Sequence, residues 1–175
     1  FRARSFYLQA LVKSSLISIE RRLGVSSVCK IIDAGGKFIL LLPNLAEMNE
    51  RLMSLDEALQ SWCRRKFKGL LTLNLAWQTR LAHKDFALAE FQKRIEQVND
   101  NLEYSKLSKL KRTMTTLGPI VNTDYDEFEG GNCSICDVNR ADAISSEKYA
   151  NAYDVASKIC RDCYQQIDII GTDLP

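Results

Sequence analysis

Four cysteines near the C-terminal end constrain the folding of this chain more than any other feature. They form two CxxC pairs, Cys133-Ser-Ile-Cys136 and Cys160-Arg-Asp-Cys163. Two such pairs can present four thiolates to one tetrahedral ion, and zinc is the metal that most favours this ligand set. The spacing therefore predicts a metal-stapled C-terminal unit beside a larger N-terminal unit that folds on its own apolar core.

A structural role for this metal is the favoured interpretation. Four thiolates fill the coordination sphere and leave no position for water or substrate. Such sites supply on the order of 10 kcal/mol of apparent binding energy to folding. The only histidine, His83, is remote in sequence, and neither a nucleophile–base–acid trio nor a Walker loop is present, so no catalytic residue is predicted. A redox-active disulfide pair is the minor alternative.

Composition indicates a soluble, cytoplasmic protein. The chain is 46% hydrophobic and 26% charged, and no apolar run approaches the roughly 20 residues of a membrane helix. The other two cysteines, Cys29 and Cys63, sit in apolar patterns as small hydrophobic residues would, which argues against a secreted disulfide framework. The opening Phe1-Arg-Ala-Arg-Ser resembles neither an initiator nor a signal peptide, and we interpret it as a cut inside a longer polypeptide.

Nucleic-acid binding is not predicted from charge, because the net charge is only +2. Two local basic clusters are nevertheless present. Solvated helix faces are the favoured interpretation of both, with contact to nucleic acid as the alternative. The clusters consist of Arg64, Arg65, Lys66 and Lys68, and of Lys106, Lys109, Lys111 and Arg112.

Periodicity and turn residues predict an α+β N-terminal domain. Residues 5–23 have a helical apolar spacing that ends at Gly24. The pattern predicts a tight hairpin around paired glycines, with strands at residues 28–32 and 37–42. A second helix with Asn44 as its N-cap should run to about Phe67, and the alternation of residues 71–77 predicts another strand.

This order of elements predicts a ferredoxin-like (RRM- or palm-like) sheet with two helices on one face. The βαββαβ pattern is complete once one strand is added before Phe1, so we expect the first strand to lie outside this chain. The predicted domains are 1–82 for the ferredoxin-like fold, 83–114 for a helical arm and 115–175 for the zinc-binding domain. The sheet lacks the aromatic pair that stacks RNA bases, which disfavours RNA binding on its face.

Two features of the N-terminal domain are candidates for contact with an anion. The turn Asp33-Ala-Gly35-Gly36-Lys37 allows close approach of a ligand to its backbone, although an ordinary hairpin turn is the commoner meaning of this pattern. Arg4 and Ser5 stand at the start of the first predicted helix, where backbone N–H groups favour an anion. Helix capping alone would explain Ser5 equally well.

These elements together resemble the large subunit of type III CRISPR effector complexes, particularly the Csm (III-A) subtype. The resemblance spans the chain in order and includes all four paired cysteines. Its other parts are Arg4-Ser-Phe-Tyr-Leu8, Ala34-Gly-Gly-Lys-Phe-Ile-Leu-Leu-Leu-Pro43, Leu71-Thr-Leu-Asn-Leu-Ala-Trp77 and Ile170-Gly-Thr-Asp-Leu174.

The resemblance implies a first palm domain followed by a zinc-binding domain. It implies a parent polypeptide that makes cyclic oligoadenylates from ATP with Mg²⁺ when target RNA is bound, in many members with an HD-type nuclease acting on single-stranded DNA. The catalytic GGDD of that family belongs to a second palm, and this sequence has no GGDD.

The segment is therefore expected to be inactive alone and to hold the non-catalytic half of the synthase site. The expected ATP contacts are Arg4, Ser5, Asp33, Gly35 and Gly36. The expected partners are the second palm, the other subunits of the complex, guide RNA and target RNA. A non-enzymatic zinc-ribbon scaffold or RNA-binding module is the alternative function.

Overall fold

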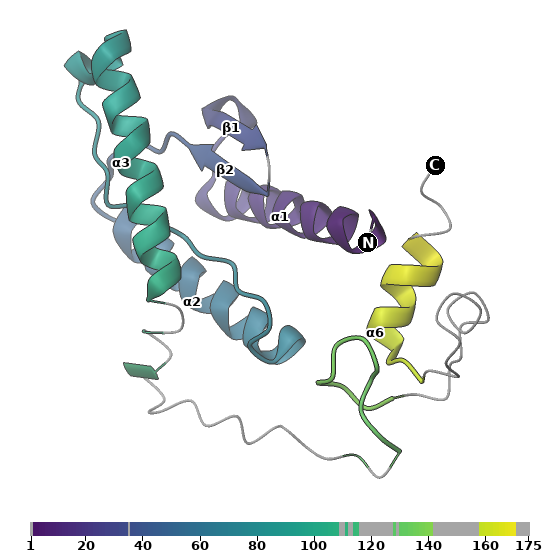
Figure 1. Cartoon of the computed structure of the whole chain (residues 1–175). Coiled ribbons are helices and arrows are strands. Elements are labelled where there is room, and N and C mark those ends of the chain that lie inside the picture. Colours follow the sequence, from purple (N-terminus) through teal and green to yellow (C-terminus); the bar gives the residue numbers. More distant parts are fainter. Residues whose placement is uncertain are drawn as a thin grey trace. The chain divides into compact units, whose positions relative to one another are not determined.

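The computed structural model of the chain describes residues 2–34, 36–108, 111, 114–115, 128, 130–141 and 158–170. Within them the fold is α+β, with helices and one two-stranded antiparallel sheet (Figure 1). The chain divides into two compact units: residues 1–18, 30–40 and 122–175, and residues 19–29 and 41–121. None of the described helices has the length and apolarity required to cross a bilayer.

The first helix, α1, extends over Arg2–Leu23 and contributes residues to both units. Ser5 therefore lies inside the helix, and its predicted capping role is wrong. The helix buries Leu16, Ile19 and Leu23 on one side, as the apolar spacing predicted for the last two. Gly24 follows with a φ of +68°, a left-handed conformation that suits glycine and ends the helix where expected.

A β-hairpin follows the short 3₁₀ turn η1 (Ser27–Cys29). Strand β1 (Lys30–Ala34) pairs with β2 (Lys37–Leu40) in antiparallel register, with Ala34 opposite Lys37 and a bulge between Lys30 and Ile32. Gly36 occupies the turn with a φ of +78°, which supports the predicted need for glycine there. Gly35 lies outside the described residues. Asp33 in β1 forms ion pairs with Lys13 of α1 and Lys30, so the hairpin contacts α1 (Figure 1).

The second helix, α2, covers Met48–Phe67 and ends where the sequence predicted. Its N-cap position is Glu47, which makes no side-chain cap hydrogen bond, so the predicted cap at Asn44 is wrong. Asn44 instead accepts a 2.5 Å hydrogen bond from the Arg80 guanidinium. The helix buries Met48, Leu52 and Leu55 together with Cys63, and Lys68 and Gly69 then adopt left-handed conformations.

Residues 71–82, all of them described, form neither helix nor strand, which contradicts the predicted strand at 71–77. A strand requires a neighbouring backbone to complete its ladder. Side chains of the neighbouring helices contact this segment instead: Ser105 donates to the Leu75 carbonyl, Asn101 donates to the Thr79 hydroxyl, and the Trp77 indole N–H donates to the Asn49 side chain of α2 at 2.9 Å. The segment thus runs antiparallel along the third helix.

That third helix, α3 (Leu88–Leu107), follows the 3₁₀ turn η2 (His83–Phe86). Asp85 joins the two: its carboxylate accepts a 2.7 Å hydrogen bond from the Ala82 N–H and pairs with Arg94 at 3.2 Å. No described residue of α3 is fully buried. His83 is exposed. Beyond Leu107 much of the predicted helix lies outside the described residues.

Candidate metal centre

The first cysteine pair sits on a tight loop whose backbone is held by its own hydrogen bonds. Asn132 and Arg140 pair as an isolated antiparallel bridge at the loop's base. Above it, the Cys133 N–H donates to the Asn139 carbonyl and the Asp137 N–H donates to the Cys133 carbonyl, each at 2.9 Å. Asp137 adopts a φ of +56°, which reverses the chain directly after Cys136. These bonds fold the loop into a knuckle that presents both thiols.

The second pair opens the C-terminal helical segment. Cys160 is the N-cap of α6 (Arg161–Tyr164), and its sulfur accepts a hydrogen bond from the Cys163 N–H at 3.5 Å. The one-turn α6 continues into the π-helical turn η3 (Gln165–Ile169). A cysteine spaced three residues from an N-cap cysteine lies over the same helix end. The CxxC pattern thus places both thiols on one side of the first turn.

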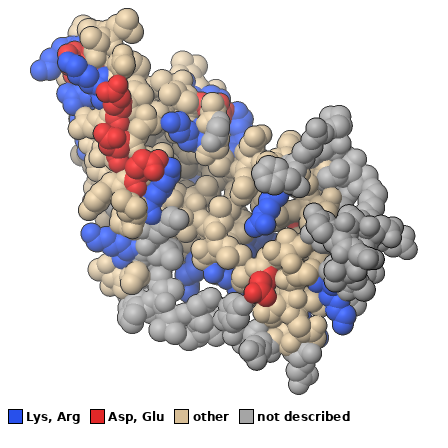
Figure 2. Space-filling model, viewed as in Figure 1, with Lys and Arg blue, Asp and Glu red and all other residues tan. Residues whose placement is uncertain are grey.

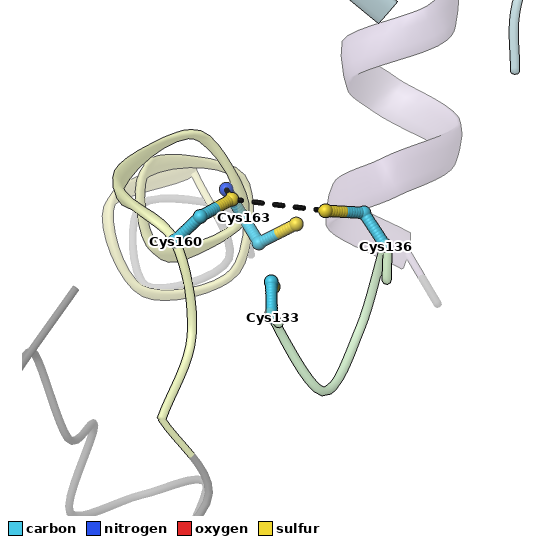
Figure 3. Close-up of side chains that lie close together, drawn as sticks. All are labelled: Cys133, Cys136, Cys160 and Cys163. Atoms are coloured by element: carbon cyan, nitrogen blue, oxygen red, sulfur yellow. Dashed lines mark hydrogen bonds between the residues drawn. The ribbon is translucent and has the colours of Figure 1, made fainter. Parts of the chain in front are cut away.

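The two knuckles bring all four sulfurs together. Their Sγ atoms lie within 4.8 Å of one another, and those of Cys136 and Cys160 are 3.9 Å apart (Figure 3). A tetrahedral zinc ion with bonds of about 2.3 Å requires sulfur–sulfur distances of about 3.8 Å. The four predicted ligands therefore fit one tetrahedral ion.

The centre is largely shielded from solvent. Cys133, Cys160 and Cys163 are buried and Cys136 is half-buried, and together with the fully buried Ile159 they form a small core. Ser134 ties the knuckles together, because its backbone N–H and its hydroxyl both donate to the Lys158 carbonyl at 3.3 Å. With four thiolates as ligands, no coordination position is left for a reacting molecule.

The thiols differ in how readily they ionise. Burial raises the pKa of Cys133, but the backbone N–H groups of Cys160, Cys136 and Ile135 outweigh it and bring the pKa down to about 7. Burial and the negative charge of Cys133 and of the other thiolates raise the pKa of Cys163, and burial likewise raises that of Cys160. A metal ion binds cysteines as thiolates, so it must displace the protons that Cys160 and Cys163 retain. The affinity of the site for the metal therefore increases with pH.

The expected ATP-contact residues lie at two places along α1. Arg4 and Ser5 are in its first turns, whereas Asp33 meets the helix at Lys13. A rise of 1.5 Å per residue places Lys13 about 12 Å along the helix axis from Ser5. Gly36 is exposed at the hairpin turn. Their contact with a nucleotide stays a prediction.

The structure adds three residues that the sequence analysis missed. Lys13 and Lys30 flank Asp33, and hydrogen bonds from these two ammonium groups lower the pKa of its carboxyl group. Asn139 extends its side chain toward the cysteines, with its amide nitrogen 3.8 Å from the Cys160 sulfur. No sequence motif marks these residues, and the contacts of Lys13 and Asn139 join positions 20 and 21 residues apart that only folding brings together.

Two residues of the basic clusters, Arg65 and Lys106, form local contacts. Arg65 donates to Ser61 of α2, and Lys106 pairs with Glu103 of α3 at 2.6 Å. Lys93 and Glu90 form a similar pair near the start of α3, and Figure 2 shows both acidic and basic side chains in the region of this helix. Lys109 and Arg112 lie outside the described residues. The interpretation of both clusters as solvated helix faces stays a prediction.

Comparisons with known proteins assign the N-terminal part to one family. A family model described as Csm1 subunit domain B matches residues 1–122. A protein of Thermococcus onnurineus (strain NA1), named CRISPR system single-strand-specific deoxyribonuclease Cas10/Csm1 (subtype III-A), is 22% identical over 175 residues. The match covers 99% of this chain and 22% of that protein, so the chain spans about a fifth of the length of this relative.

A solved structure is also similar. It is the crystal structure of a Csm1–Csm4 cassette in complex with cA3, with a TM-score of 0.48 and 19% sequence identity. The match covers 67% of this chain and 18% of that one.

Proposed function

The chain belongs to the Csm1 subunit domain B family, and we propose that it forms the first palm and zinc-binding segment of the large subunit of a type III-A CRISPR effector complex. The observation that carries this proposal is the family match over residues 1–122, followed in the same chain by a preformed four-cysteine centre. The parent would act in RNA-guided antiviral defence, with the other subunits, guide RNA and target RNA as partners.

The described elements support a palm fold. Helix α1, the β1–β2 hairpin and α2 follow one another as the αββα middle of a βαββαβ domain. In that topology the first strand would pair with the last one. A first strand contributed by another part of the parent polypeptide would pair with residues 71–77, which form no strand here.

The proposed chemistry is synthesis of cyclic oligoadenylate from ATP, with the catalytic metal ions held by a second palm. This chain contains no GGDD motif. The acid of its hairpin, Asp33, already forms ion pairs with two lysines. Asp33 therefore suits fixing of the hairpin better than binding of Mg²⁺. The exposed Arg4 is the candidate for direct contact with a phosphate. Ser5 and the turn glycines Gly35 and Gly36 are the further proposed contacts.

Zinc is the metal proposed for the cysteine centre, and its role is structural. It would be held by Cys133, Cys136, Cys160 and Cys163, and would supply folding energy to a segment whose described residues form only a small buried cluster. Nuclease activity on single-stranded DNA, which the name of the Thermococcus relative states for that protein, would reside outside this chain.

The test uses the intact parent assembled with its partner subunits and guide RNA. Labelled ATP, Mg²⁺ and matching target RNA should give oligoadenylate products only when target is present. Replacing Arg4 with Ala should raise the ATP concentration needed for half-maximal rate by about tenfold or more, as expected for the loss of a hydrogen bond to a charged group. The control Arg22→Ala changes an exposed arginine at the other end of the same helix and should have little effect.

Absence of product, with guide and target RNA still tightly bound, would favour the alternative of a zinc-stapled scaffold or RNA-binding module. Equal ATP dependence of the two arginine variants would remove Arg4 from the nucleotide site while leaving the synthase assignment intact.

A further inference from the structure

One side chain outside the cysteine set reaches a candidate metal ligand. The Asn139 side-chain amide donates to the Cys160 sulfur, with an N···S distance of 3.8 Å. Its own backbone is fixed in the opposite knuckle, because the Asn139 carbonyl accepts the Cys133 N–H at 2.9 Å. Asn139 therefore connects the first knuckle to a sulfur of the second.

The Cys160 sulfur accepts hydrogen bonds from both knuckles. Besides Asn139, it is contacted by the Cys163 N–H at 3.5 Å and by the Cys136 sulfur at 3.9 Å. The residue is 97% buried, since only 3% of its surface is exposed. A thiolate there has little access to water, so donors from the protein must stabilise its charge.

The net charge of the metal-bound centre explains why N–H donors beside the sulfurs matter. Four thiolates and one divalent zinc ion carry a net charge of −2, and much of that charge resides on the sulfurs. N–H donors aimed at a ligand sulfur lower its electron density and fix its orientation, as outer-shell groups do at other metal sites. Among the described residues, two N–H groups donate to the Cys160 sulfur, and the one from Asn139 belongs to a side chain.

We propose that Asn139 is a positioning residue of the metal centre, which holds the Cys160 thiolate in place and stabilises its negative charge through an N–H···S hydrogen bond. This inference rests on the proposed zinc site. The residue touches a ligand of the metal and not the metal itself.

The test compares the full 175-residue chain with two variants. Asn139→Ala removes the donor, and Asn139→Asp keeps the size of the side chain while placing an acceptor beside the thiolate. Zinc affinity is measured by competition with a chromophoric chelator. Loss of an outer-shell partner should weaken binding by about tenfold to 100-fold. The loss should be greater for Asn139→Asp because its carboxylate also repels the thiolates.

A second readout separates this role from a merely structural one. In the cobalt(II)-loaded chain, the sulfur-to-metal charge-transfer band should move to lower energy in Asn139→Ala, because an electron-richer thiolate gives up its electron more readily. Ser134→Ala is the matched control. The Ser134 hydroxyl also links the two knuckles, by donating to the Lys158 carbonyl, but the backbone N–H of the same residue donates to that carbonyl as well and is kept in the variant. The control should retain both the zinc affinity and the band position.

Each remaining outcome is decisive. An Asn139→Ala variant with the affinity and spectrum of the control would overturn the proposal. Loss of all metal binding in both Asn139 variants would also overturn it, because one outer-shell bond accounts for about 100-fold at most. Failure of the unmodified chain to bind zinc would instead refute the proposed zinc site.

Discussion

Asp137 shows how one residue's backbone shapes the metal centre. Its φ of +56° turns the chain after the first cysteine pair. Asparagine and aspartate tolerate this region, whereas a β-branched residue is strained there. We expect Asp137→Val to lose about 1–2 kcal/mol of stability and Asp137→Asn to keep it. Thermal unfolding of the zinc-loaded chain measures both, and equal losses would contradict the backbone explanation.

Asp85 is the residue whose ionisation should be visible in the stability of the chain. The backbone N–H of Ala82, with Arg94 as a further partner, lowers the pKa of this carboxyl group below its ordinary value of 3.8. A depressed pKa contributes stability that is complete above 3.8 and is lost as the pH falls through the lower folded-state value.

Asp85→Asn should therefore destabilise the chain at about pH 7 and make little difference at about pH 2. Denaturant unfolding at both pH values checks this. Asp100→Asn, at an exposed position of α3, is the control. A constant difference between Asp85→Asn and the unmodified chain at both pH values would exclude the ionic contribution.

At the scale of elements, α1 offers two adjacent residues with opposite environments. Leu16 is 1% exposed, whereas the neighbouring Ile17 is 39% exposed. Truncating a buried leucine costs the lost transfer energy and the cavity it leaves, about 2–5 kcal/mol. Leu16→Ala should lose that much in urea unfolding and Ile17→Ala less than about 1 kcal/mol. Similar losses would mean that the buried face of α1 is assigned wrongly.

Helices and the hairpin could be predicted from sequence because their signals are local. The apolar spacing and Gly24 located the end of α1, and the paired glycines located the hairpin turn. The predicted N-cap at Asn44 was wrong. Asparagine is a common N-cap residue, but in the folded chain the Asn44 side chain accepts a hydrogen bond from Arg80. Capping competes with every other partner that folding brings near.

The predicted strand at 71–77 failed for a different reason. Alternating Leu71, Leu73 and Leu75 indicates one buried face, yet every residue of this stretch is half-buried in the structure. Pairing depends on a second backbone, which no local pattern reports. The four metal ligands were identifiable because CxxC spacing is set by the ion's geometry. Asn139 was not, since it meets Cys160 only across the fold.

At the scale of the whole molecule, we expect the metal ion to stabilise the cysteine-containing segments and not helix α2. Removing zinc with a chelator should abolish hydrogen-exchange protection around residues 130–141 and 158–170, because few buried apolar residues remain to order them. Helix α2, with its own buried apolar residues, should keep its protection. Hydrogen exchange followed by mass spectrometry resolves the two regions. Retained protection at the knuckles without metal would show that they fold without an ion.

The measurement that tests the central claim most directly is the zinc content of the purified chain. Elemental analysis should find one zinc ion per chain, and Cys163→Ser should lose it or bind it far more weakly. Cys29→Ser, at a half-buried cysteine outside the four-sulfur set, should keep it. A zinc-free unmodified chain whose CxxC cysteines are joined as disulfides would contradict the account and favour the redox alternative.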